Sequence, residues 1–191
     1  MFSELVLKTR TIRRFDRSKS VTDTDLTNII ECASSVASAG NLQRLRYVTL
    51  TGASAEEAFS MVSLGGLLPE NKKPTVDVAP TAYIVLTSAF ESPDQNLLID
   101  VGISAEAIVL AARERGIGSC IIRNFNREHF ASLMTEQYPF PLLVIALGYP
   151  AEDAKIVRVC ERESLKYYKD ENEVNVVPKM TSDSLTVAKR Q

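Results

Sequence analysis

Four positive charges fall within seven residues near the start of the chain: Lys8, Arg10, Arg13 and Arg14. On a chain with a net charge of -2, like charges at this density indicate a bound anion. Arg10 and Arg13 are three residues apart, so on a helical turn they would face the same way, with the Thr11 hydroxyl nearby. This group suits a phosphate. The alternative is a solvated basic turn, which is what charge runs usually form.

A second polar group follows at residues 36–43, where a helical pattern ends in Val-Ala-Ser-Ala-Gly-Asn-Leu-Gln. Gly40 permits a backbone conformation that is closed to other residues. Ser38, Asn41 and Gln43 carry hydroxyl and amide groups, which both donate and accept hydrogen bonds. Such groups suit a polar heterocycle. The alternative is an ordinary helix end with a glycine stop.

Several catalytic and binding motifs are absent from the sequence. It contains no Gly-x-Gly-x-x-Gly, Gly-x-x-x-x-Gly-Lys-Ser/Thr, Cys-x-x-Cys, His-Glu-x-x-His or Gly-x-Ser-x-Gly. A nucleotide-binding parallel sheet, a zinc site and a serine hydrolase therefore lose support. The arginine segment and the amide-rich turn remain, and together they could hold the phosphate and the flat polar ring of one molecule. Flavin mononucleotide (FMN) has that shape.

The histidine and the cysteines give little sign of catalysis or metal binding. His129 falls on the polar side of an expected helix, and no carboxylate or serine is placed to work with it, so we expect a solvated side chain. Cys32, Cys120 and Cys160 are odd in number, far apart and without metal-ligand spacing. They are expected to be buried free thiols, with a reactive cysteine as the less favoured alternative. No metal site is predicted.

Composition favours one globular domain over residues 1–191, because 45% of the residues are hydrophobic and no linker interrupts the chain. The small net charge gives no sign of a nucleic-acid or membrane surface. No apolar run is long enough to span a bilayer, and the first residues lack the pattern of a signal peptide. We therefore expect a cytoplasmic protein.

Periodicity and capping residues place the elements around the two polar groups. Thr22 is expected to cap an amphipathic helix that leads into the turn at residues 38–43. Helices are also expected near the amino terminus and at residues 54–64, 95–115 and from Asn126, and strands at residues 46–51, 81–87, 117–122 and 142–148. The helix at 95–115 has an apolar stripe of Leu98, Val101, Ala105, Ile108, Val109 and Ala112. Residues 67–80, with three prolines, are expected to form an ordered loop or a flexible lid over a site.

Residues 151–191 are charged and contain little apolar sequence. A hairpin is expected at residues 166–177, turning near Asn172, with a weak helix from Ser182. Because this tail has few residues with which to build a core, it should be ordered against its own domain or across a partner subunit.

Four motifs in the same order resemble the nitroreductase family of flavin-dependent oxidoreductases. They are Arg10-Thr-Ile-Arg-Arg-Phe15, Ser38-Ala-Gly-Asn-Leu-Gln43, Asp100-Val-Gly-Ile-Ser-Ala with Gly116-Ile-Gly-Ser, and Ala146-Leu-Gly-Tyr-Pro150. The match is nearest to small members whose tail carries an Asp-Glu-Asn hairpin, here Asp170 to Asn172. Together the motifs cover nearly the whole chain.

The resemblance implies a role for each matching position. Arg10, Thr11 and Arg13 would bind the flavin phosphate, joined by Lys179 from the tail. Ser38, Asn41 and Gln43 would approach the ring or ribityl chain, from the second subunit. Ile122 and Arg123 would lie against the polar edge of the flavin. No catalytic residue is implied, because the flavin carries the chemistry.

Three positions depart from the family pattern. Thr9 stands where many members have an arginine, Arg44-Leu45 replaces a proline-aromatic pair, and Met180 follows Lys179 in place of a second basic residue. The first and third reduce the charge of the phosphate site, and the second alters the expected substrate pocket.

The resemblance implies an α+β fold with a mostly antiparallel sheet flanked by helices, a homodimer, and a tail at 151–191 that extends onto the partner. It also implies that NADH or NADPH supplies electrons through FMN to a nitroaromatic compound, a quinone or a similar small acceptor. The alternatives are a flavin carrier or sensor without turnover, and reductive dehalogenation or flavin-consuming chemistry on the same fold.

Overall fold

The protein is described from a computed structural model that covers residues 1–65, 68–161, 163–188 and 190. The chain divides into two compact units, Met1–Ala151 and Glu152–Gln191, and each is described separately.

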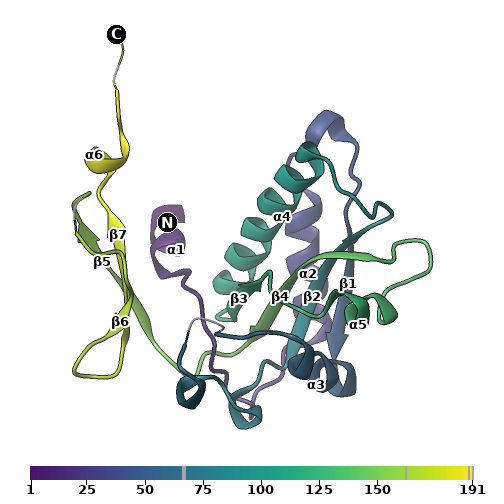
Figure 1. Cartoon of the computed structure of the whole chain (residues 1–191), viewed down its shortest axis with the longest axis horizontal. Coiled ribbons are helices and arrows are strands. Elements are labelled where there is room, and N and C mark those ends of the chain that lie inside the picture. The colour runs from purple at the N-terminus through teal and green to yellow at the C-terminus, as the bar shows by residue number, and fades with distance from the viewer. Residues whose placement is uncertain (66–67, 162, 189, 191) are drawn as a thin grey trace. The chain divides into compact units, whose positions relative to one another are not determined.

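A sheet of four strands forms the centre of the first unit (Figure 1). Its strands are β1 (Arg46–Thr51), β2 (Ala82–Ser88), β3 (Gly118–Ile122) and β4 (Phe140–Gly148). The order is β1-β2-β4-β3, and every neighbouring pair is antiparallel. All residues of β2 are buried, as a central strand covered on both faces requires. The expected antiparallel α+β fold is confirmed.

Helices cover both faces of the sheet because side chains alternate along each strand. On one face, α2 (Asp23–Ser34) and α4 (Gln95–Glu114) pack on Ile84 and Leu86 of β2. On the other, α3 (Gly52–Met61) and α5 (Arg127–Ser132) pack on Tyr83 and Val85. Figure 1 shows α2 and α4 running side by side. The site described below therefore lies on a rigid two-sided core.

Capping side chains fix the starts of these helices. The Thr22 hydroxyl accepts from the Asp25 N–H while the Asp25 carboxylate accepts from the Thr22 N–H, which forms a capping box at α2. Asp94 caps α4 by accepting from the Leu97 N–H, and Asn126 caps α5 by accepting from the His129 N–H. The expected caps at Thr22 and Asn126 are thus confirmed.

The helix α4 presents apolar residues in more than one direction. Leu97, Val101, Ala105 and Ile108 are buried, whereas Leu98 is 52% exposed, so its assignment to the buried stripe was wrong. Over the described residues, α4 is the one helix that length and apolar composition would allow to cross a membrane, and half of its most apolar stretch is buried inside the unit.

The amino-terminal segment runs along an edge of the sheet. After α1 (Phe2–Lys8) the chain is irregular. Arg10 and Arg13 therefore do not lie on the helical turn that their spacing suggested. Here Thr11 bridges to Ser119 of β3, and the Ile12 N–H donates to the Ser119 carbonyl at 2.9 Å. This pairing with a distant strand replaces the local bonds of a helix.

Two glycines let this segment lie close to the sheet. A Cβ atom on Gly118 would come within 2.9 Å of Ile12, and one on Gly148 within 2.7 Å of Phe15. Both partners are core residues, with Phe15 only 1% exposed. The absence of a side chain at these positions therefore sets the path of the arginine segment.

Residues 67–80, expected to be an ordered loop or a flexible lid, contain two short 3₁₀ turns, η2 (Glu70–Lys72) and η3 (Val76–Val78). Residue 67 lies outside the described residues. Two arginines hold the loop: Arg14 donates to the Lys72 carbonyl at 2.9 Å and Arg17 donates to the Val76 carbonyl at 2.9 Å. The loop is therefore an ordered segment fastened to the amino-terminal chain.

The second unit is a small sheet followed by one helical turn. Its elements are β5 (Ala154–Val159), β6 (Tyr168–Lys169), β7 (Asn175–Met180) and α6 (Ser182–Leu185). The expected hairpin is present as the antiparallel pair β6 and β7, but β5, which pairs in parallel with β7, was not expected. Val159, Val176 and Pro178 are its buried apolar residues among those described, so this unit has a very small core.

The cysteine prediction is correct at one position only. Cys120 is buried in β3, whereas Cys32 and Cys160 are exposed, and all three are free thiols. Cys32 lies on the outer side of α2, and Cys160 follows β5 in the small second unit.

Candidate functional site

The arginine segment and the end of β3 lie on the same edge of the main sheet. Thr11 lies beside Ser119, and the strand then continues to Ile122, three positions further on, where it ends. Three strand positions span about 10 Å. Thr11 is exposed and Arg13 is half-buried, while Ile12 between them is buried in the core. This edge of the sheet therefore carries the polar residues Thr11 and Arg13, while the buried side chain of Ile12 packs in the core.

Arg10 has a second structural role at the end of α1. Its Nη2 donates to the Val6 carbonyl at 2.8 Å, so the guanidinium caps the carboxyl end of that helix. This contact limits the directions in which the Arg10 head group can point. The guanidinium of the neighbouring Arg14 donates to the Lys72 carbonyl in the loop. Arg14 is therefore engaged with the loop and is not one of the residues predicted to bind a phosphate.

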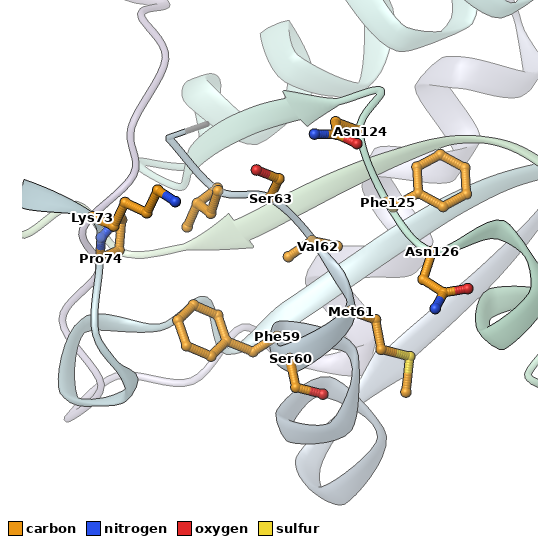
Figure 2. Close-up of a pocket in the computed structure, with 11 residues that line it drawn as sticks. Phe59, Ser60, Met61, Val62, Ser63, Lys73, Pro74, Asn124, Phe125 and Asn126 are labelled. Carbon is orange, nitrogen blue, oxygen red and sulfur yellow. The ribbon is translucent and has the colours of Figure 1, made fainter. Parts of the chain in front are cut away.

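A pocket of about 560 Å³ opens where β3 ends (Figure 2). The chain after Arg123 pairs with the segment after α3: the Ser63 N–H donates to the Asn124 carbonyl, and the Asn126 N–H donates to the Met61 carbonyl, both at 2.9 Å. Lys73 and Pro74 close the opposite side of the pocket. Its lining combines amide, hydroxyl and ammonium groups with the aromatic rings of Phe59 and Phe125.

The amide-rich turn is a short 3₁₀ helix, η1 (Ala39–Asn41), with an unusual backbone. Gly40, Asn41 and Gln43 all have positive φ, at 57°, 54° and 47°. The Gln43 N–H donates to the Ser38 hydroxyl at 3.2 Å, and the Gln43 amide donates to the Asn41 side-chain oxygen at 3.1 Å. The three predicted residues Ser38, Asn41 and Gln43 are therefore brought together in one hydrogen-bonded turn.

Two carboxylates, one at the N-cap of α4 and one within that helix, hold this turn and the residue after it. Neither of them was identified from the sequence. Asp100, 3% exposed, accepts a hydrogen bond from the Ala39 N–H at 2.9 Å. Asp94 accepts two hydrogen bonds from the Arg44 guanidinium, at 2.8 and 2.9 Å. Arg44 also lies over the Phe90 ring, with its Cζ atom 5.8 Å from the ring centroid. Arg44, which departs from the family pattern, thus takes part in holding the turn.

The ion pair with Arg44 lowers the pKa of Asp94 from 3.8 to about 2, with the Leu97 N–H as a further cause. The Asp94 carboxylate therefore remains charged through mildly acidic conditions and both caps α4 and holds Arg44.

A second cavity, of about 260 Å³, lies between α2, α4 and the chain around the turn. Ser38, Gln43, Leu45 and Asp100 contribute to its lining, together with the hydroxyl pair of Tyr47 and Ser104, whose oxygens are 2.9 Å apart. The amide turn thus borders a mostly apolar cavity that also contains these polar groups.

The predicted site residues therefore form two groups within the first unit. Arg10, Thr11, Arg13, Ile122 and Arg123 lie along β3 and just beyond it, and Ser38, Asn41 and Gln43 lie on the turn beside α4. Lys179 lies on β7 of the second unit and is described with that unit only. No sequence pattern marked Asp94 or Asp100 as partners of the turn, although an N-cap aspartate at position 94 was recognisable.

The chain was compared with known proteins. The sequence model of the nitroreductase family matches residues 6–149, well over half of the chain. A Bacillus subtilis (strain 168) protein that carries the name NAD(P)H nitroreductase YodC is 21% identical over 182 residues, covering 78% of this chain and 90% of its own length.

Solved structures show the same fold. A nitroreductase family protein from Streptococcus pneumoniae TIGR4 superposes with a TM-score of 0.66 at 20% identity, covering 86% of this chain and 96% of that one. The FMN-dependent nitroreductase NfnB from Mycobacterium smegmatis, solved in complex with NADPH, gives a TM-score of 0.62 at 18% identity, covering 78% of this chain and 87% of that one. At these identities the likeness concerns the fold.

Proposed function

Because the chain belongs to the nitroreductase family, we propose that it is an FMN-dependent enzyme that passes electrons from NADH or NADPH to a small acceptor such as a nitroaromatic compound or a quinone. Family membership makes the protein an oxidoreductase. The cofactor, the electron donor and the acceptor are the proposed part. The NADPH complex of NfnB supports the choice of a nicotinamide donor.

The observation that best supports FMN is the path of the arginine segment along β3. The backbone of Thr11 lies beside Ser119, about 10 Å along the strand from Ile122, and Arg10 and Arg13, whose guanidinium groups suit a phosphate, are close to Thr11 in the chain. An extended ribityl chain with its phosphate ester has a comparable length. The donor groups present therefore fit a ligand with a phosphate at one end and a ring at the other.

Each group of residues then has a binding role. Arg10, Thr11 and Arg13 hold the phosphate, with Lys179 added from the tail. Ser38, Asn41 and Gln43 offer donors and acceptors to the ring or ribityl chain, from the second subunit. Ile122 and Arg123 border the ring at the end of β3, where the 560 Å³ pocket leaves room for an acceptor. FMN supplies the two-electron chemistry when bound, and the protein supplies orientation and electrostatics.

A homodimer is part of the proposal, and the outer face of α4 supports it. Leu98, Ile99 and Ile103 are 52%, 57% and 37% exposed, and a Cβ atom on Gly102 would meet nothing within 4 Å. Contiguous exposed apolar residues on a long helix mark an interaction surface. We propose that the second unit extends onto the partner, because its own core is so small. The cytoplasmic location remains a prediction from the sequence.

The test uses the full-length purified protein. We expect a yellow preparation that releases FMN on denaturation and oxidises NADH or NADPH faster when a nitroaromatic compound or quinone is added. A colourless preparation that fails to bind added FMN would contradict the proposal. A protein that binds FMN but oxidises NADH or NADPH no faster when an acceptor is added would instead be a flavin carrier or sensor.

A further inference from the structure

The turn at residues 38–43 has a backbone that needs support from outside. Asn41 and Gln43 adopt positive φ without being glycine, as Gly40 does beside them. Such conformations are costly for residues with a side chain and persist where surrounding contacts impose them. The bonds within the turn join it to itself, through Ser38, Asn41 and Gln43. They do not fix its position on the molecule.

Asp100 supplies a fixed point. Its Oδ1 accepts from the Ala39 N–H at 2.9 Å, at the start of the turn, and its own backbone lies in the longest helix of the unit. One helical turn later, Ser104 meets the Tyr47 hydroxyl at 2.9 Å, where the chain has entered β1. Residues four apart on a helix share a face, so α4 holds the segment both at Ala39 and at Tyr47.

The second Asp100 oxygen adds no further hydrogen bond to the fold. Oδ2 is buried and has no hydrogen-bond partner among the described residues. A buried charge with incomplete hydrogen bonding destabilises a fold relative to an apolar residue of similar size. The side-chain hydrogen bond of Asp100 to the Ala39 N–H therefore acts on the geometry of the turn.

We propose that Asp100 is the positioning residue of the cofactor turn: through the Ala39 N–H it holds Ser38, Asn41 and Gln43 in the arrangement that receives the flavin. The role of Asp100 in positioning the turn rests on its hydrogen bond to the Ala39 N–H. The expected effect on FMN binding rests on the proposed function.

Three substitutions test the proposal. Asp100→Leu removes the acceptor, whereas Asp100→Asn keeps an oxygen for the Ala39 N–H and removes the charge. Ala39→Pro removes the N–H itself. Ser38 has φ -133° and ψ 151°, which is allowed before proline, and Ala39 is the first residue of η1, where proline is favoured. Glu114→Leu, at an exposed carboxylate in the last turn of α4, is the matched control.

The dissociation constants for FMN and riboflavin are measured by titration of flavin fluorescence. We expect Asp100→Leu and Ala39→Pro each to weaken both ligands by about tenfold, because each substitution removes the hydrogen bond that fixes the turn. The double variant should also lose about tenfold, since both changes remove the same contact. Asp100→Asn and Glu114→Leu should stay within about threefold of the parent protein.

A second measurement separates this proposal from the proposed function. In the flavin-free protein, hydrogen exchange of the amides at residues 40–43 should be faster in Asp100→Leu and Ala39→Pro, with the melting temperature compared to detect general unfolding. Failure of the parent protein to bind flavin would overturn the proposed function and leave the exchange result as the test of Asp100. Additive losses, unchanged exchange, or an Asp100→Asn variant as weak as Asp100→Leu would overturn the role of Asp100. If Asp100→Leu does not fold, Ala39→Pro and Asp100→Asn decide between these outcomes.

Discussion

Arg44 and Asp94 form a bidentate ion pair across 50 positions of the sequence, with nitrogen to oxygen distances of 2.8 and 2.9 Å. The pair joins the end of the amide turn to the first turn of α4. It also gives the protein a defined response to acid, because Asp94 is the carboxylate whose pKa it lowers.

The first prediction concerns stability between pH 5 and pH 2. The pKa of Asp94 falls from 3.8 to about 2 on folding, so its contribution is complete above pH 3.8 and is lost as the pH falls toward 2. Asp94→Asn keeps an N-cap side chain and removes the charge. Its deficit in free energy of unfolding, measured in urea, should therefore be constant above pH 5 and shrink below pH 3.8. A deficit that does not change with pH would mean that the ion pair contributes nothing. Because Asp94 is 58% exposed, high salt should reduce the deficit as well.

The second prediction concerns the phosphate group. Arg13 is proposed to form a charge-assisted hydrogen bond that contributes about 1.5–3 kcal/mol, so Arg13→Ala should weaken FMN binding by roughly tenfold to more than a hundredfold. Riboflavin, which has no phosphate, should be affected much less. Equal weakening of both ligands, or no change in either, would show that Arg13 belongs to a solvated basic segment. The opposite pattern is expected for Asp100→Leu, which should weaken both ligands alike.

The third prediction concerns the fit of the amino-terminal segment on the sheet. A Cβ atom at Gly148 would lie 2.7 Å from Phe15, which is buried, so Gly148→Ala should cost about 1–3 kcal/mol of unfolding free energy. It should also displace the segment that carries Arg13 and weaken FMN binding. Phe15→Ala removes the two nearest atoms, Cδ1 and Cγ, so Gly148→Ala should cost less in a Phe15→Ala background than in the parent protein, in urea unfolding and in flavin titration. Strict additivity of the two substitutions would contradict this account.

The fourth prediction concerns the outer face of α4. Ile99 is 57% exposed, and Ile99→Lys places a charge in the proposed dimer interface. Analytical ultracentrifugation should show a shift from dimer to monomer at micromolar protein concentration. Val76→Lys, an equivalent change at a residue 64% exposed in η3, is the control and should leave the dimer intact. An Ile99→Lys dimer as stable as the parent would place the interface elsewhere.

The fifth prediction concerns the second unit. Deleting residues 152–191 should reduce dimerisation and FMN retention together, because this unit has too few buried residues to be stable alone and contains Lys179. Retention is measured as the ratio of flavin to protein after gel filtration. A truncated protein that remains dimeric and keeps its flavin would show that the tail has neither role.

Strong local signals predicted most of the main fold. Thr22 with Asp25 marks the start of α2, and the β-branched residues of 46–51 and the apolar run at 81–87 identify two strands of the sheet. In each case the secondary structure is set by residues within the element itself, so periodicity and capping residues are enough to predict it. The antiparallel α+β class followed from these elements together with the family resemblance.

Long-range contacts account for the predictions that failed. Thr11 pairs with Ser119, more than 100 positions away, and that bond makes the arginine segment extended where the spacing of Arg10 and Arg13 suggested a helical turn. Leu98 was assigned to the buried stripe because α4 is apolar on two faces, so periodicity did not decide which face is covered. Asp100 resembled an ordinary polar position of a helix, since its partner, the Ala39 N–H, leaves no trace in side-chain sequence.

The strand order has a consequence for the solubility of the chain. With the order β1-β2-β4-β3, the strand β3 lies at one edge of the sheet, and Ile121 on it is 46% exposed. Unpaired edge strands invite pairing with other molecules and lead to aggregation. The Ile12 N–H occupies the Ser119 carbonyl, so the segment that carries the arginines also shields this edge. A chain that lost its first fifteen or so residues would expose β3, and aggregation would accompany the loss of the predicted phosphate-binding groups.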